Sequence, residues 1–113
     1  MIPVGARVVA YVPDLGDRSR IDAAVAGVRH VGRVEDLAGV AADADVVLVD
    51  LRRPGALEAA AAIVGPGRTV IGFAPHVDDD RLGRAREAGL TEVLPRSLFF
   101  HRVSGGGRPP TAP

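Results

Sequence analysis

Residues 46–74 read VVLVDLRRPGALEAAAAIVGPGRTVIGFA, two apolar runs with a helix-like segment between them. The runs Val46–Asp50 and Thr69–Ala74 are almost continuously apolar, which is typical of strands covered by helices on both faces. The segment between them carries small or apolar residues at the spacing of one helical stripe, namely Leu57, Ala60, Ala61 and Val64. The sequence Gly-Pro-Gly at 65–67 then ends the predicted helix. This order predicts two parallel strands joined by a helical crossover.

The same alternation continues on both sides of this stretch. Shorter apolar runs lie at 7–12, 28–31 and 92–94, so five strand–helix units follow one another at intervals of about twenty residues. A chain of this kind predicts an α/β fold with a flavodoxin-like, doubly wound, five-stranded parallel sheet in the order 2-1-3-4-5. The last helix is expected to be short, because the chain enters SGGGRPPTAP at position 104. We therefore expect one domain over residues 1–103 and a disordered tail over 104–113.

Length and composition exclude several classes of function. The chain has 113 residues, the size of one domain, and its 14 basic and 14 acidic side chains give a formal charge of +0. This balance argues against direct binding of nucleic acid or of an anionic membrane. No cysteine is available for a disulfide or a thiolate metal site. No apolar run reaches the roughly 18 residues of a membrane span, and no signal-peptide pattern opens the chain, so a cytoplasmic protein is expected.

Two aspartates are candidates for a binding site. Asp14 follows the first predicted strand and Asp50 ends the third, and these strands are neighbours in the predicted order. Ligands of such sheets bind outside the carboxyl ends of the strands, where both carboxylates should meet. Paired carboxylates favour a hard cation such as Mg²⁺. Aspartates also commonly end strands and begin turns, so the pair alone leaves both interpretations open.

Two motifs resemble the receiver domains of bacterial response regulators. In VVLVDLRRPG, Pro54 stands four residues after Asp50, as in the aspartate-x-x-x-proline motif around the family's phosphoacceptor. REAGLTEVL, at 86–94, resembles the end of the fourth helix and the fifth strand of receivers, and the likeness extends over residues 7–103. The resemblance implies that Asp50 is the phosphoacceptor position and Asp14 one of two acidic Mg²⁺ positions. It also implies a role in two-component signalling and phosphorelay.

Three residues depart from the receiver pattern. Ala74 stands where the family has a switch threonine or serine, Arg96 where it has a lysine, and Pro13 where it has the second acidic residue. Alanine has no hydroxyl for a phosphoryl oxygen, and proline removes both a carboxylate and a backbone donor. Arg96 keeps a positive charge and could form an ion pair with Asp50 that fills the pocket. A degenerate receiver is therefore expected, and any Mg²⁺ at Asp14 and Asp50 should bind weakly.

The last helix carries the candidate partner surface. In receivers the fourth helix, fifth strand and fifth helix form the common surface for dimerisation and output, and Phe99 and Phe100 stand there. The leading hypothesis is a stand-alone, non-enzymatic, receiver-like signalling module whose partner is a kinase, an output protein or a regulatory protein. It leaves a homodimer open. The alternative is a small flavodoxin-like enzyme, or a metal- or metabolite-binding protein, that uses the Asp14/Asp50 crevice.

Overall fold

The computed structural model describes residues 2–105 of the chain. The predicted tail therefore lies outside the described residues from position 106 onward. Its first two residues, Ser104 and Gly105, form a turn that ends the last helix, because their backbone N–H groups donate to the carbonyls of Phe100 and Arg102 at 3.1 and 3.0 Å. No helix in residues 2–105 combines the length and the apolar character that crossing a bilayer requires.

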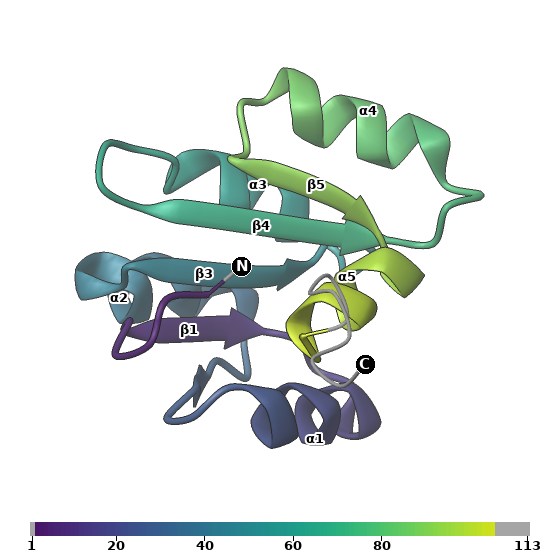
Figure 1. Cartoon of the computed structure of the whole chain (residues 1–113). Coiled ribbons are helices and arrows are strands. Elements are labelled where there is room, and N and C mark those ends of the chain that lie inside the picture. The colour runs from purple at the N-terminus through teal and green to yellow at the C-terminus, as the bar shows by residue number, and fades with distance from the viewer. Residues whose placement is uncertain (1, 106–113) are drawn as a thin grey trace.

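Five strands form one parallel sheet in the order β2-β1-β3-β4-β5, which confirms the predicted fold (Figure 1). The strands are β1 (Val8–Tyr11), β2 (Arg29–His30), β3 (Val46–Asp50), β4 (Thr69–Ala74) and β5 (Glu92–Pro95). β2 has only two residues, in keeping with the weak apolar run from which it was predicted. Every strand runs in the same direction, so all five carboxyl ends lie along one edge.

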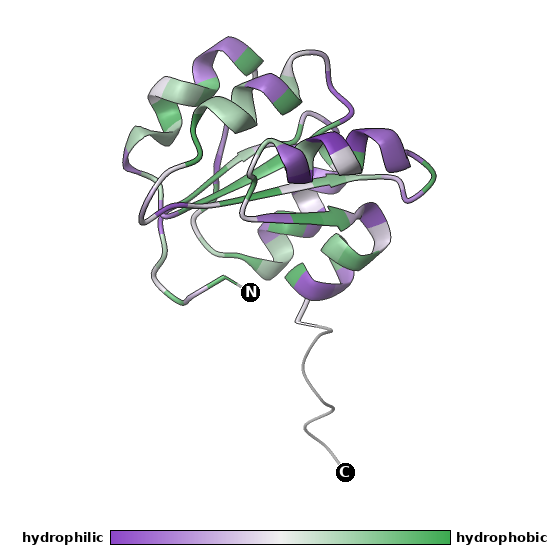
Figure 2. Cartoon of the chain, turned by 90° about the horizontal axis from the view of Figure 1, so that it is seen from above, coloured by the Kyte–Doolittle hydropathy of each residue, from purple (hydrophilic) through white to green (hydrophobic). Residues whose placement is uncertain are grey.

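Helices cover both faces of the sheet, so the chain forms three layers (Figure 2). The α-helices are α1 (Leu15–Ala24), α2 (Leu37–Val40), α3 (Ala56–Ala62), α4 (Asp79–Glu87) and α5 (Arg96–Val103). Two short 3-10 turns, η1 (Val34–Asp36) and η2 (Ala41–Asp43), flank α2. α2, α3 and α4 pack on one face and α1 and α5 on the other. The last helix has eight residues, as the sequence predicted for a shortened element.

The stripe predicted for the helix after β3 is wrong in phase. The buried residues on this segment are Ala56, Ala60 and Ile63, whereas Leu57 is half-buried and Val64 is exposed. The observed set also has helical spacing (i, i+4, i+7). It begins at Ala56 instead of Leu57 and ends at Ile63 instead of Val64. Two alanines at the interface allow the α3 backbone to approach the sheet closely, and the larger leucine is left at the margin of the core.

The core between the sheet and helices α1 and α5 contains three phenylalanines. Phe73 of β4 stacks on Phe99 with ring centroids 4.2 Å apart, and Phe100 meets both rings edge-on at 5.5 and 5.0 Å. Phe99 and Phe100 are both buried, so neither ring is available as the candidate partner surface that the sequence suggested. Successive helix residues are about 100° apart, and the sheet-facing direction of α5 falls between these two. Both rings therefore enter the core.

Candidate functional site at the carboxyl edge

The carboxyl edge of the sheet brings the predicted site residues together. Pro13 and Asp14 follow β1, Asp50 ends β3, Ala74 ends β4, and Arg96 begins the helix that follows β5. β1, β3, β4 and β5 are consecutive neighbours in the sheet. The register pairs Asp50 with Phe73 and Ala74 with Pro95, so these strand ends are level with one another. This edge is where open parallel sheets place their ligands.

Asp14 serves as the N-cap of α1. Its side-chain Oδ1 accepts a hydrogen bond from the backbone N–H of Asp17 at 2.9 Å, and the residue is exposed. A cap of this kind satisfies one of the N–H groups that the first turn of a helix leaves without a partner. Oδ1 of Asp14 therefore serves the start of its own helix, which is a common role of an aspartate that follows a strand.

Asp50 is enclosed by the loop that follows it. The residue is 0% exposed, and its Oδ1 accepts the backbone N–H of Arg52 at 3.1 Å. The Nε atoms of Arg52 and Arg53 lie 3.5 Å from Oδ1 and Oδ2, respectively. Among the described residues, Oδ2 has no hydrogen-bond partner. Asp50 is therefore a buried carboxylate with two loose ion pairs and one incompletely satisfied oxygen.

Arg96 pairs with Asp17, and the predicted ion pair between Arg96 and Asp50 is wrong. Nη1 of Arg96 donates to Oδ2 of Asp17 at 2.7 Å and Nη2 donates to Oδ1, which makes the contact bidentate. Asp17 is 3% exposed, on the first turn of α1. Position 17 is one helical turn from Asp14, so the α1 helix turns a third carboxylate toward the site.

The electrostatics of this pair follow from its geometry. The hydrogen bond from Arg96 lowers the pKa of Asp17, against the opposing effect of burial, and the charge of Arg96 lowers it further. The same hydrogen bond raises the pKa of Arg96, with the charges of Asp17, Asp50 and Asp14 adding to the effect. Both side chains therefore remain charged over the whole neutral range.

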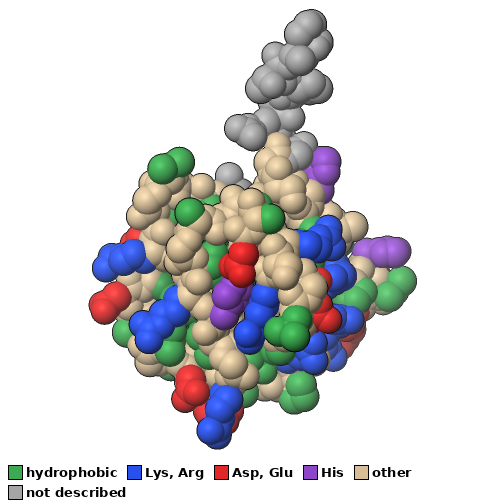
Figure 3. Space-filling model, turned by 90° about the horizontal axis from the view of Figure 1, so that it is seen from below, with side chains coloured by type: hydrophobic (Ala, Val, Ile, Leu, Met, Phe, Trp, Pro, Cys, Tyr) green, Lys and Arg blue, Asp and Glu red, His purple; other side chains and the backbone are tan. Residues whose placement is uncertain are grey.

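Two arginines lie over one aromatic ring beside this pair. The guanidinium carbons of Arg20 and Arg96 are 4.1 and 4.9 Å from the centroid of Phe100. These distances are within the range of cation–π attraction. In the space-filling view, positive side chains gather toward one side of the face shown, with carboxylates among them (Figure 3). Phe100 is thus a buried platform that supports Arg96 instead of a contact for a partner.

Comparison with known proteins identifies the fold. No family model matches the sequence, and no curated protein matches it. Among solved structures, a response regulator from Hahella chejuensis aligns with a TM-score of 0.73 over 89% of this chain and 91% of its own, at 21% identity. The phosphorylated cyanobacterial phytochrome response regulator RcpA aligns at 0.70 and 20% identity over 88% and 89% of the two chains. The fold is the receiver fold.

A third similar structure is that of a response regulator with bound manganese. The Mn²⁺-bound form of the response regulator Rcp1 aligns with a TM-score of 0.66 at 15% identity, over 88% of this chain and 90% of its own. In this receiver fold, residues 2–105 include no group of three or more His, Asp or Glu side chains placed to hold a metal ion. Asp50 is enclosed by arginines, Asp14 uses one oxygen as a cap, and Asp17 is held by Arg96. A divalent cation at Asp14 and Asp50 would have to compete with these contacts.

Ala74 and Pro13 lie at the carboxyl edge as the sequence predicted. Ala74 is fully buried at the end of β4, and its side chain is a methyl group. Pro13 offers neither a carboxylate nor a backbone N–H. At the carboxyl edge, Ala74 therefore offers no hydroxyl, and Pro13 offers no carboxylate.

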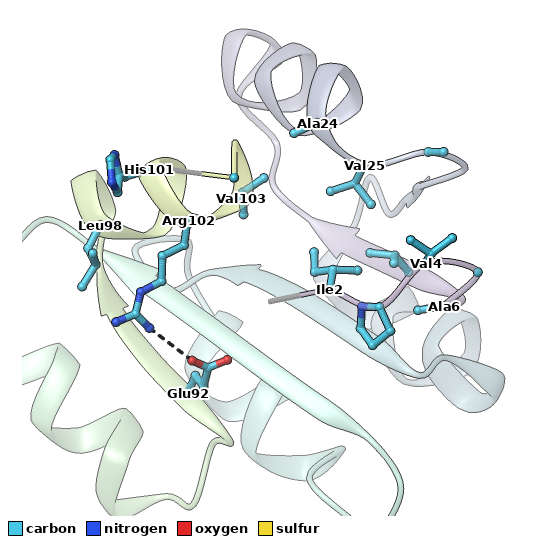
Figure 4. Close-up of a pocket in the computed structure, with 15 residues that line it drawn as sticks. Ile2, Val4, Ala6, Ala24, Val25, Glu92, Leu98, His101, Arg102 and Val103 are labelled. Carbon is cyan, nitrogen blue, oxygen red and sulfur yellow. Dashed lines mark ion pairs between the residues drawn. The ribbon is translucent and has the colours of Figure 1, made fainter. Parts of the chain in front are cut away.

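A groove of about 950 Å³ lies at the amino edge of the sheet (Figure 4). The N-terminal segment, the end of α1, the start of β5 and residues of α5 line it. An ion pair of 3.5 Å between Arg102 and Glu92 stands on its wall. None of the predicted site residues contributes to this groove.

Proposed function

We propose that the protein is a receiver-like signalling module that acts through protein–protein contacts, without conventional phospho-switching at Asp50. The observation that carries the proposal is the enclosure of Asp50. A phosphoacceptor must present a carboxylate oxygen to the phosphodonor, whereas the Asp50 side chain is 0% exposed beneath Arg52 and Arg53. Access requires both arginines to give up their ion pairs with it.

The surrounding residues support the same proposal. A conventional receiver transmits phosphorylation through a hydroxyl at the end of the fourth strand and a lysine after the fifth. Here the first position is Ala74 and the second, Arg96, is held by Asp17 through both terminal nitrogens. A phosphoryl group on Asp50 would thus meet no hydroxyl at position 74 and no unengaged cation at position 96.

The proposed partners are proteins, such as a kinase, an output protein or a regulatory protein in the cytoplasm. The large apolar side chains exposed in residues 2–105 are Val4, Leu15, Val64 and Val77, none of which lies on α4, β5 or α5. A contact on that surface would therefore rely on polar and charged side chains. Any Mg²⁺ bound at Asp14 and Asp50 is expected to be weak, and no other cofactor is proposed.

An enzyme or metabolite-binding protein has less support. That alternative needs the crevice between Asp14 and Asp50 to be open. In the structure the first carboxylate caps a helix and the second is enclosed. We therefore propose a non-enzymatic role.

The test is exposure to a phosphodonor followed by amide NMR. The protein is incubated with acetyl phosphate, or with beryllofluoride, in the presence of Mg²⁺, and Asp50→Asn serves as the matched control. The changes in amide chemical shift on adding the phosphodonor should be the same in the wild type and the control everywhere outside the loop that follows β3. Shifts that appear only in the wild type and extend through α5 would show a working switch and overturn the proposal.

A further inference from the structure

Two partly exposed arginines on the loop after β3 have unused hydrogen-bond donors. Arg52 and Arg53 approach Asp50 through Nε at 3.5 Å, and their side chains are 41% and 37% exposed. Within residues 2–105 neither guanidinium donates a hydrogen bond, and Nε of Arg53 is buried without an acceptor. Because a guanidinium carries five N–H donors, the Nη groups of both side chains are left for a second acceptor.

The charges at this edge are layered, with carboxylates beneath guanidiniums. The side chains of Asp50 and Asp17 are 0% and 4% exposed, whereas those of their arginine partners are 30–41% exposed. The whole chain has a formal charge of +0, yet a molecule that approaches these pairs meets the guanidiniums first. The positive charge of the pairs is therefore on the surface and the negative charge is in the interior.

Exposed apolar side chains stand on both sides of the two arginines. Leu15, the first residue of α1, is 74% exposed, and Val77, in the connection after β4, is 79% exposed. The loop of Arg52 and Arg53 lies between these two connections, because β3 has β1 and β4 as its neighbours. Protein interfaces combine apolar contacts with arginines in this way.

We propose that the carboxyl edge binds an acidic segment of a partner protein, whose carboxylates pair with Arg52 and Arg53 and whose apolar side chains pack on Leu15 and Val77. The inference rests on the proposed function, in which the partners are proteins, and it adds the surface and the chemistry of the contact. Asp50 is then a positioning residue, which attracts the Nε sides of the two arginines while the partner accepts hydrogen bonds from their Nη groups. Binding needs neither a phosphoryl group nor the exposure of Asp50.

An acidic segment fits the charge of this surface. Arg52 and Arg53 carry two positive charges over the single negative charge of Asp50. A planar guanidinium forms two parallel hydrogen bonds with a carboxylate, and opposite charges speed the encounter of two proteins. Two acids at the same edge already have local contacts, since Asp14 caps α1 and Asp78 has its own arginine partner at 3.2 Å.

Titration with a synthetic acidic peptide, followed by amide NMR, tests the proposal. The peptide alternates Glu or Asp with Leu or Gly, and a neutral peptide carries Gln and Asn in place of the acids. At low salt the acidic peptide should bind with a Kd of about 0.1–1 mM. It should shift the amide signals of Leu15, Arg52, Arg53 and Val77, whereas the neutral peptide should shift none of them at the same concentration.

Charge variants locate the contact. Replacing Arg52→Gln and Arg53→Gln together should weaken binding about fivefold or more, because two exposed ion pairs with the peptide are lost. The matched control, Arg84→Gln with Arg102→Gln, removes two arginines from exposed ion pairs on α4 and α5. This control has the same net charge as the first variant and should bind the peptide as the wild type does.

A second pair of variants tests the apolar contacts. Leu15→Ser with Val77→Ser should weaken binding about threefold or more, because apolar area of the peptide is no longer covered. The matched control is Val4→Ser with Val64→Ser, which removes the other two exposed large apolar side chains of the described residues. This control should leave the Kd unchanged.

Three results of the titration would contradict the inference. They are the absence of shifts at the four positions, equal shifts with the neutral peptide, and a wild-type Kd in the variant without Arg52 and Arg53. If that variant does not fold, the side-chain Nε–H signals of both arginines in the wild type decide, and they should shift with the acidic peptide alone.

Sedimentation with vesicles of phosphatidylglycerol and phosphatidylcholine tests a membrane as the occupant instead. Binding to the vesicles that depends on Arg52 and Arg53, without binding to the acidic peptide, would also exclude the inference. Neither experiment contains a phosphodonor, whereas a working switch at Asp50 would be detected with the phosphodonor alone. Failure of this inference and failure of the proposed function are therefore separate results.

Discussion

Asp17 and Asp50 are both buried aspartates at one edge of the sheet, yet their neutralisation should have different effects on stability. In Asp17→Asn, two hydrogen bonds with Arg96 lose their charge assistance, one of them 2.7 Å long. A hydrogen bond to a charged group contributes about 1.5–3 kcal/mol, and breaking a buried ion pair costs about 3–5 kcal/mol. Arg96 is partly exposed and regains some hydration, so we expect a loss of about 2–4 kcal/mol.

Asp50→Asn should change the free energy of unfolding by less than about 1 kcal/mol, or increase it. The two arginine contacts of Asp50 are 3.5 Å long, its Oδ2 accepts no hydrogen bond among the described residues, and its desolvation is complete. Loose pairs of this kind seldom offset the cost of burying a charge. Asparagine retains an oxygen that can accept the N–H of Arg52, and Arg52 and Arg53 remain exposed enough to be hydrated.

Urea unfolding of both variants is the measurement. With an m-value of about 1.5 kcal/mol/M, a loss of 3 kcal/mol lowers the midpoint by about 2 M. Asp17→Asn should show this decrease, whereas Asp50→Asn should remain near the wild-type midpoint. Glu58→Gln is the control, because the contact of Glu58 with Arg84 is exposed and 3.8 Å long. Equal losses in the two aspartate variants, or a larger loss in Asp50→Asn, would refute the assignment of Asp17 as the tightly paired carboxylate.

Three further predictions concern pH and packing. The pKa of Asp17 is lower in the folded protein than the value near 4 of an unfolded aspartate. Its contribution to the free energy of unfolding is therefore complete above about pH 4 and is lost as the pH falls through the folded pKa. Below about pH 4, the free energy of unfolding should fall more steeply with decreasing pH in the wild type than in Asp17→Asn, as measured by urea unfolding at each pH. Gly72→Ala should cost about 1–3 kcal/mol by calorimetry, because its Cβ would lie 2.8 Å from methyl carbons of Leu51 and Leu90 and overpack the core. Phe99→Ala should cost about 3–5 kcal/mol in urea unfolding, since a fully buried ring is removed, and a loss below 1 kcal/mol would contradict its place in the core.

The sheet could be predicted from sequence because its signals are local and its topology is constrained. Val46–Asp50 and Thr69–Ala74 match β3 and β4 residue for residue. Gly89 follows the end of α4, and its φ of 89° is the left-handed conformation that glycine adopts readily. The handedness of crossover connections then leaves few strand orders for five such units. The location of Asp14, Asp50, Ala74 and Arg96 at one edge follows from that order.

The partner of Arg96 could not be predicted in the same way. An arginine side chain is long enough to reach several carboxylates at this edge, and only the phase of α1 decides which one it meets. Asp17 gave no separate signal, because an acidic residue in the first turn of a helix is favoured by the helix dipole alone. The phase of α3 and the burial of Phe99 and Phe100 depended likewise on how each helix rotates against the sheet. One residue of rotation moves a side chain by about 100°.

The Arg96–Asp17 contact and the contacts of Arg52 and Arg53 with Asp50 differ in how easily they can separate. Arg96 and Asp17 are held by a bidentate contact, an aromatic platform and two helices, so separating them disturbs the packing of α1 and α5. Arg52 and Arg53 belong to the loop that covers Asp50, and their side chains are 41% and 37% exposed. Both can rotate into solvent with no change in the core. A partner or ligand that alters this protein at its carboxyl edge should therefore act first on the loop after β3, while α5 remains where Arg96 holds it.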